Sequence, residues 1–245
     1  MIDPAEVATL AAIAFAGALI FGITGFGSAL VTIPLATHLV PLPFALALFA
    51  LCDLASTLRV GFENPRNAVR SEWTRLVPMI LVGTALGVTL LVNLPRTTGM
   101  LLLGLFVLAF ALLTLFSRTR ERIISPAWAW VAGLAGGITS TVFGVGGPPY
   151  AMYLSQRGLT KEQFRATMGF ATMTSISLRI VAFTLTGLLL DPEVWWKALF
   201  VVPSCLAGIW VARKVFVRIS RDALMRAVAV VLLISGSSLV YRALL

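Results

Sequence analysis

Long apolar runs separated by short basic loops dominate this sequence, and they constrain the fold more than any other feature. The runs cover about residues 7–38, 43–60, 74–94, 97–117, 126–154, 163–188, 194–212 and 223–243. Apolar residues make up 59% of the chain and charged residues only 12%, whereas a water-soluble domain is roughly a quarter charged. Unbroken apolar runs of roughly 20 residues indicate transmembrane helices, and the alternation typical of a membrane β-barrel is absent. The sequence therefore predicts an all-α integral membrane protein.

The distribution of charge argues against nucleic acid as a partner, although the formal net charge is +9. The basic residues lie in short loops between the apolar runs, as the positive-inside rule describes for helical membrane proteins. Cys52 and Cys205 lie inside apolar runs without metal-type spacing, and His38 is the single histidine. We therefore expect the lipid bilayer and a small solute as partners, with no metal and no cofactor. The first run is preceded by Asp3 and Glu6 without Lys or Arg, so we expect it to be retained rather than cleaved as a signal peptide.

Two of the runs, 7–38 and 126–154, are too long for one spanning helix, and each contains a cluster of glycines. The first cluster comprises Gly22, Gly25 and Gly27; the second comprises Gly136, Gly137, Gly144, Gly146 and Gly147, followed by Pro148 and Pro149. Adjacent prolines remove two backbone donors and disfavour helix at the preceding residue. The second long run is therefore expected to break at Gly147.

The chain also repeats itself at intervals of about 120 residues. Phe26-Gly27 matches Phe143-Gly144, the stretch from Phe44 to Arg59 matches that from Phe164 to Arg179, and Pro78 matches Pro203. The sequence thus predicts a single membrane domain, 1–245, made of two repeats at about 7–117 and 126–243. Each repeat would contain one glycine-broken segment and three transmembrane helices.

The loop charges indicate how the repeats are related. If each long run crossed the membrane once, the basic loops at 118–122 and 157–165 would lie on opposite sides. If each run is instead a re-entrant hairpin of two half-helices, the loops at 59–75, 118–122, 157–165 and 213–226 all face the cytoplasm and hold 15 of the 19 basic residues. Each half then crosses three times, which inverts the second repeat and places both termini outside an inner (plasma) membrane. Two single broken crossings are the alternative.

Inverted repeats with broken helices are typical of secondary transporters, whose half-helix N-termini favour an anion. Some of the glycines can instead serve only close helix packing, which is the interpretation we prefer for Gly83, Gly87, Gly104 and Gly208. At the two breaks we expect a ligand site. Its candidate substrate-binding residues are Thr24, Gly25, Phe26, Gly27, Ser28, Phe143, Gly144, Gly146, Gly147 and Pro148.

Three charged residues within or near the runs are further candidates. Arg179 lies inside an apolar segment, where a charge usually faces an internal cavity, so we expect it in the substrate site. Asp53 either pairs with an arginine or titrates and couples a proton to transport. Arg59, the repeat partner of Arg179, is a candidate coupling residue or reaches the lipid headgroups. The polar stretch at 172–177 precedes Arg179 and is expected to turn partly toward the same cavity.

The two glycine motifs resemble those of a known family. The stretches "FGITGFGSALVTIPL" and "GGITSTVFGVGGPPYAMYL", the latter followed by "LTKEQFRATMGFATMTSISLRIVAF", are similar to the TauE/SafE family of sulfite exporters, the TSUP permeases, over about residues 10–240. This resemblance implies a permease for sulfur-containing anions such as sulfite or organosulfonates, or for other small oxyanions or carboxylates. Coupling to H⁺ or Na⁺, the direction of transport and the oligomeric state stay open.

The residues alone leave two other classes of function open, an anion channel and a membrane-embedded enzyme or assembly subunit. No sequence motif of metal-dependent or nucleophilic catalysis is present, and a single histidine argues against a histidine-based active site. We therefore expect a transporter and not an enzyme.

Overall fold

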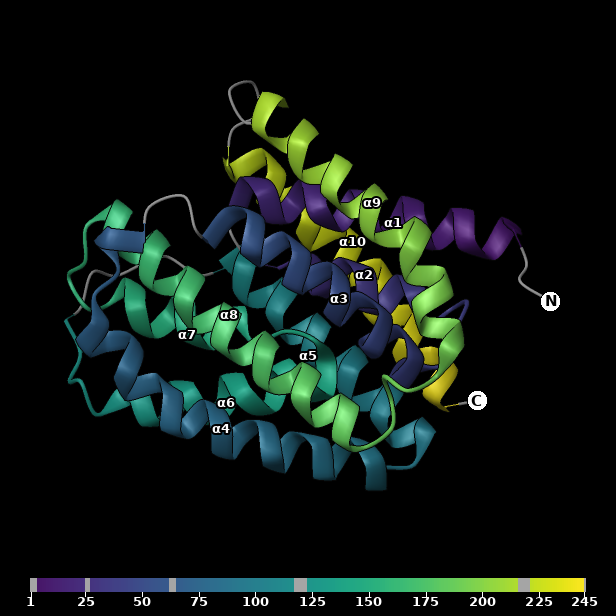
Figure 1. Ribbon diagram of the computed structural model, residues 1–245, viewed down its shortest axis with the longest axis horizontal. Coiled ribbons are helices and arrows are strands. Elements are labelled where there is room, and N and C mark those ends of the chain that lie inside the picture. Colours follow the sequence, from purple (N-terminus) through teal and green to yellow (C-terminus); the bar gives the residue numbers. More distant parts are fainter. Residues whose placement is uncertain (1–3, 25–26, 62–64, 117–122, 216–220, 245) are drawn as a thin grey trace.

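The computed structural model describes residues 4–24, 27–61, 65–116, 123–215 and 221–244, and within these ranges every regular element is a helix (Figure 1). This confirms the predicted all-α fold. Five helices, α1, α3, α4, α8 and α9, are long and apolar enough in the described residues to cross a membrane. The elements in chain order are α1 (Pro4–Thr24), α2 (Ser28–Ala36), α3 (Leu42–Gly61), the 3-10 helix η1 (Pro65–Asn67), α4 (Arg70–Asn93), α5 (Arg96–Phe116), α6 (Trp128–Phe143), α7 (Gly147–Ser155), α8 (Lys161–Leu185), α9 (Pro192–Val215) and α10 (Arg221–Leu244).

Both long apolar runs are broken, and a glycine in the left-handed region marks each break. Gly27 has φ 91° directly before α2, and Gly144 has φ 75° directly after α6. Only glycine adopts this conformation without strain from a Cβ atom. The predicted break at Gly147 is wrong by three residues, because Pro148 and Pro149 do not end α6. They occupy the first turn of α7, where a missing N–H leaves no intrahelical bond unmade.

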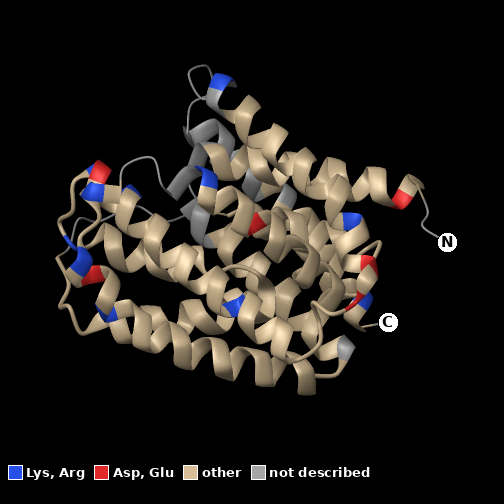
Figure 2. Cartoon of the chain, in the orientation of Figure 1, with Lys and Arg blue, Asp and Glu red and all other residues tan. Residues whose placement is uncertain are grey.

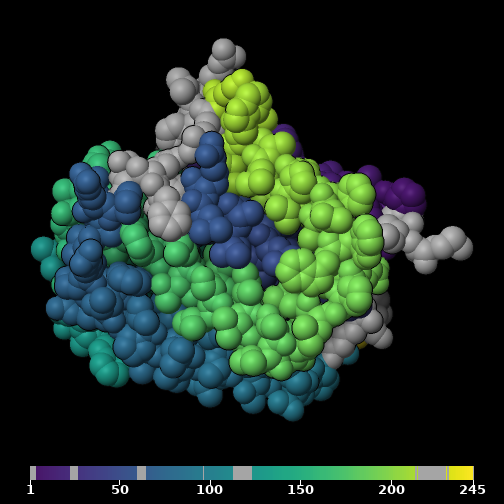
Figure 3. All heavy atoms as spheres, in the orientation of Figure 1, coloured from purple at the N-terminus to yellow at the C-terminus, as the bar shows by residue number. Residues whose placement is uncertain are grey.

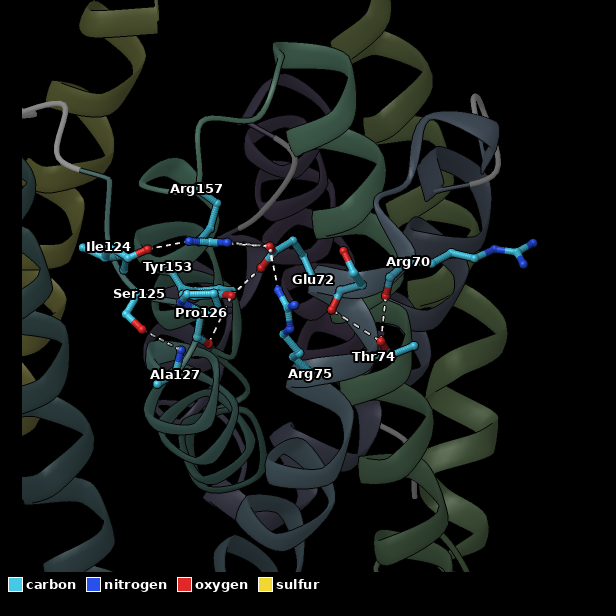
Figure 4. A network of polar contacts seen from close by, with 11 residues as sticks. Arg70, Glu72, Thr74, Arg75, Ile124, Ser125, Pro126, Ala127, Tyr153 and Arg157 are labelled. Atoms are coloured by element: carbon cyan, nitrogen blue, oxygen red, sulfur yellow. Dashed lines mark hydrogen bonds and ion pairs between the residues drawn. The ribbon is translucent and has the colours of Figure 1, made fainter.

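Contacts between helix ends show that each broken segment returns to the end of the molecule where it began. Lys197, near the start of α9, pairs with Glu6 of α1 at 2.5 Å and lies 4.8 Å from the ring centroid of Phe44, near the start of α3. At the opposite end of the molecule, where α3 ends and α4 begins, the Tyr153 hydroxyl of α7 contacts both Glu72 of α4 and the Pro126 carbonyl that precedes α6 (Figure 4). Each broken segment is therefore a re-entrant hairpin.

The arms of the hairpins are unequal. The first hairpin has arms of 21 and 9 residues, and the second has arms of 16 and 9 residues. At about 1.5 Å per residue, the 21 residues of α1 match the roughly 30 Å of a bilayer core. The expectation of two half-helices per hairpin is thus wrong for α1, whereas α2 and α7 are short enough to begin at the break inside the membrane and end at its surface.

The helices pack in pairs that correspond between the halves. α4 lies along α6, α1 lies along α9, and α3 and α8 pack together in the middle of the molecule (Figure 1). A Cβ atom on Gly83 of α4 would overlap the Leu134 carbonyl of α6, and one on Gly208 of α9 would lie 2.5 Å from the Phe15 carbonyl of α1. Gly87 and Gly104 meet neighbouring helices in the same way, so the packing role expected for these four glycines is confirmed. An inverted relation between the repeats stays a prediction.

The outer surface of the helix bundle is apolar. Charged residues gather toward the two ends of the long helices, and few lie between them (Figure 2). On the face shown in Figure 3, α4, α8 and α9 lie side by side. Large apolar side chains of α4 and α9, such as Leu81, Leu86, Leu199 and Phe200, are exposed. Lipid is the solvent that suits such a surface. Polar and charged groups inside the bundle are therefore the informative ones.

Candidate functional site

The two hairpin breaks and helices α3 and α8 meet around one small cavity of about 40 Å³. That volume is enough for a few water molecules at most. Ser28 at the start of α2 and Gly147 at the start of α7 both line it, so the two short helices begin at the same place. The lining residues are Phe21, Gly27, Ser28, Ala29 and Asp53 from the first half, and Ser140, Gly144, Val145, Gly146, Gly147, Tyr150, Thr172, Ser175 and Ile176 from the second.

A buried ion pair joins the two halves at this cavity. Arg179 of α8 donates through Nη2 to Asp53 Oδ2 of α3 at 2.8 Å, and through Nη1 to the Ser140 carbonyl of α6 at 2.8 Å. The other carboxylate oxygen of Asp53 accepts a hydrogen bond from Ser28 Oγ, also at 2.8 Å. Arg179 is 1% exposed and Asp53 is 6% exposed. Of the two roles open to Asp53, pairing with an arginine is thus the one that the structure shows.

Arg179 lies directly behind the cavity wall. It is not itself a lining residue, but its partners Asp53 and Ser140 are, and a Cβ atom on Gly144 would lie 3.4 Å from Arg179 Nη1. Its Nε has no hydrogen-bond partner among the described residues, although the side chain is fully buried. Buried polar atoms are rarely left unpaired, and an unmade bond of this kind costs about 1–3 kcal/mol. Arg179 therefore has unused hydrogen-bonding capacity beside the cavity.

The two short helices differ in what their N-termini offer. The first turn of α2 carries free backbone N–H groups and has no side-chain cap, whereas Pro148 and Pro149 remove two of the N–H groups at the start of α7. Both helix dipoles favour negative charge at the cavity, but α2 supplies more hydrogen-bond donors. The expectation that both breaks aim N–H groups at the ligand holds better for α2. Pro148 is buried in the first turn of α7 and does not line the cavity.

The other predicted site residues lie in several places. Gly27, Ser28, Gly144, Gly146 and Gly147 line the cavity as expected. Phe143 does not: its ring stacks on Phe106 with centroids 5.0 Å apart. Arg59 is exposed near the end of α3 and is not a lining residue. Gly25 and Phe26 lie outside the described residues, as does the side chain of Thr24, which ends α1.

Tyr150 is the cavity residue that the sequence analysis missed. Its side chain is fully buried, and its hydroxyl donates to Ser175 Oγ at 3.1 Å. Within the polar stretch of α8, Thr172 and Ser175 line the cavity, whereas Thr174 accepts a hydrogen bond from the Trp73 indole at 3.0 Å. Tyrosine in an apolar helix usually serves packing, so the sequence alone does not indicate Tyr150 as a site residue. The available signal was its position in the first turn after the Pro-Pro pair.

Comparisons with known proteins identify the family of this chain. The family model described as "Sulfite exporter TauE/SafE" matches residues 10–239. The chain is 25% identical over 193 residues to a "Probable inner membrane transporter protein TsaS" of Comamonas testosteroni, covering 78% of this chain and 81% of that protein. No solved structure matches the chain. This chain therefore belongs to the TauE/SafE sulfite exporter family and is a membrane transporter.

Proposed function

We propose that this protein is a secondary permease that moves a small sulfur-containing anion, such as sulfite or an organosulfonate, by alternating access. The observation that carries the proposal is the buried Asp53–Arg179 pair beside a cavity that both hairpin breaks line. The family description and the transporter name of the relative support it. Small carboxylates and other oxyanions are the alternative cargo.

The orientation belongs to the same proposal. The starts of α4 and α6 lie at one end of the molecule, where Arg157 binds Glu72 and the Ile124 carbonyl. This is the end that the basic loops assign to the cytoplasm. The starts of α1 and α9 lie at the other end, where Lys197 pairs with Glu6, and this supports the proposal of two outside termini and an inverted second repeat. Hairpins that open toward opposite sides allow access to the cavity from each side in turn.

The carboxylate in the cavity wall sets the condition for anion binding. An ionised Asp53 repels an anion with about 4 kcal/mol at 4 Å in the effective dielectric of a protein. Protonation of Asp53 removes this repulsion and releases Arg179 Nη2, which then binds the anion in place of the carboxylate. One proton therefore accompanies each anion. We accordingly assign H⁺, rather than Na⁺, as the coupling ion.

Charge balance supports this exchange. The empty site holds one guanidinium and one carboxylate, and the loaded site would hold one guanidinium, one monovalent anion and a neutral Asp53. The net charge in the low-dielectric interior is zero in both states. Because an uncompensated charge there costs several kcal/mol, such an exchange keeps the barrier to loading low.

Reconstituted vesicles test the proposal. With a pH gradient imposed, we expect the wild type to accumulate radiolabelled sulfite with saturable kinetics. Arg179→Gln should abolish both accumulation and exchange, because the remaining site has no cation. Asp53→Asn should still exchange internal for external anion but should no longer respond to the pH gradient.

Arg59→Gln is the matched control, because Arg59 lies on the same helix as Asp53 but is exposed. It should transport like the wild type. Normal sulfite transport by Arg179→Gln, or gradient-driven accumulation by Asp53→Asn, would contradict the proposed mechanism. Flux that does not saturate would identify a channel instead.

A further inference from the structure

We propose that Tyr150, acting through Ser175, determines which anion the cavity accepts by providing a fixed hydroxyl donor that selects oxyanions over halides. The inference rests on the proposed function, since it concerns the substrate of the same cavity. Tyr150 and Ser175, here called the hydroxyl pair, come from α7 and α8 and both line the cavity. Neither residue belongs to the Asp53–Arg179 ion pair.

The position of the Tyr150 ring is fixed by two glycines. A Cβ atom on Gly136 would overlap the ring, and one on Gly146 would lie 3.1 Å from it. The side chain is fully buried, so no solvent competes for its hydroxyl. A donor held in one place by its surroundings loses little entropy when a ligand binds. The ring therefore acts as a rigid support for the hydroxyl.

The hydrogen bonds around the cavity indicate where a donor is available. Ser28 already donates to Asp53, and Thr172 donates to the Met168 carbonyl at 2.8 Å. Tyr150 donates to Ser175 Oγ, which accepts this bond and keeps its own hydrogen for another acceptor. Successive hydrogen bonds in a low-dielectric interior strengthen one another. The hydroxyl pair thus ends in a polarised donor at the cavity wall.

This donor distinguishes anions by the number and separation of their acceptors. An oxyanion has several oxygen atoms, so one can bind Arg179 while a second accepts from the hydroxyl pair. A halide is a single atom and cannot occupy both positions. The remaining wall includes apolar side chains such as Phe21, Val145 and Ile176, which donate no hydrogen bond to a halide. Sites built on hydrogen bonds reject ligands that leave their polar groups unpaired.

Tyr150→Phe is the direct test, because phenylalanine keeps the ring between the two glycines and removes only the hydroxyl. Binding of sulfite and of chloride to the purified protein is measured for each variant, with chloride also tested as a competitor of sulfite. We expect Tyr150→Phe to weaken sulfite binding roughly 2- to 10-fold, because Ser175 loses the neutral hydrogen bond that orients and polarises its hydroxyl. Chloride binding should remain as in the wild type, so that the preference for sulfite falls by the same factor.

Two further variants make the result decisive. Tyr153→Phe is the matched control on the same helix, because its hydroxyl contacts Glu72 and does not line the cavity. It should bind both anions like the wild type. Ser175→Ala removes the hydroxyl that donates to the anion, and it should reduce the preference for sulfite even if Tyr150→Phe fails to fold.

The outcomes separate this inference from the proposed function. A wild-type protein that binds no anion would overturn the proposed function. A wild-type protein that binds sulfite, combined with an unchanged ratio of sulfite to chloride affinity in Tyr150→Phe or Ser175→Ala, would overturn only the role of the hydroxyl pair. Equal weakening of both anions would show that Tyr150 supports the cavity without selecting its ligand.

Discussion

The energetic coupling between Asp53 and Arg179 can be measured by removing each partner alone and then both together. Arg179→Met and Asp53→Asn each break the 2.8 Å ion pair and leave the other charge buried without a counter-charge. The double variant buries neither charge. If the pair is an interacting unit, the effects of the single substitutions on the free energy of unfolding are therefore not additive.

The magnitudes follow from the contacts that each substitution removes. Breaking one partner of a buried pair costs about 3–5 kcal/mol. Arg179→Met should lie at the upper end of this range, because it also leaves the Ser140 carbonyl without its donor. Asp53→Asn should lie at the lower end, since an amide oxygen still accepts from Ser28. The double variant should lose only about 1–3 kcal/mol, mainly for the unpaired Ser140 carbonyl.

Reversible unfolding in mixed micelles of increasing SDS content, followed by circular dichroism, gives the four free energies of this cycle. A parallel cycle that combines Asp53→Asn with Arg59→Met serves as control, because Arg59 is exposed and should show no coupling. If the double variant lost as much as the sum of the single variants, within about 0.5 kcal/mol, Asp53 and Arg179 would not stabilise each other. The exchange of Asp53 for an anion at Arg179 would then lose its basis.

Two further predictions concern groups away from the cavity. Glu72 accepts hydrogen bonds from Arg157 at 2.9 and 3.2 Å and from Tyr153 (Figure 4). Glu72→Gln should therefore lower the free energy of unfolding by about 1.5–3 kcal/mol, measured as a lower melting temperature. An unchanged melting temperature would show that these contacts do not stabilise the protein. Burial and the neighbouring Arg242 lower the pKa of His38, which means that the folded protein binds this proton less tightly than the unfolded chain. Stability should therefore fall as the pH drops below about 6.5, and His38→Gln should reduce that loss in melts at pH 8 and pH 5.

Much of the helical framework could be predicted from the sequence, because it follows from local chemistry. Backbone polar groups inside lipid must be paired within their own segment, so the apolar runs form helices, and only the two long runs with glycine clusters are each divided into two helices. Gly27 and Gly144 interrupt the two long runs because both adopt a left-handed backbone conformation, which a residue with a Cβ atom adopts only with strain. The exact start of α7 was less accessible, since a proline pair can either end one helix or begin the next.

The candidate site was only partly accessible in this way. Arg59 and Arg179 occupy matching positions in the two repeats, yet one is exposed and the other is 1% exposed. Sequence marked both as candidates but did not separate them with certainty, because the difference depends on how far each arginine lies along its helix and which way it faces. Tyr150 was missed for the same reason: its importance comes from Ser175, on a different helix.

The sequence by itself determined that the chain is a membrane protein with two glycine-broken segments, and that Asp53 and Arg179 are charges inside it. Only the tertiary structure decided that these two residues, 126 positions apart, neutralise each other, and that Tyr150 lines the cavity beside them. The physical reason lies in the solvent. Lipid chains are as apolar as a protein core, so the two faces of a membrane helix need not differ in hydrophobicity. The rotation of each helix about its axis, which selects the side chains that meet inside, is therefore set by packing against its neighbours.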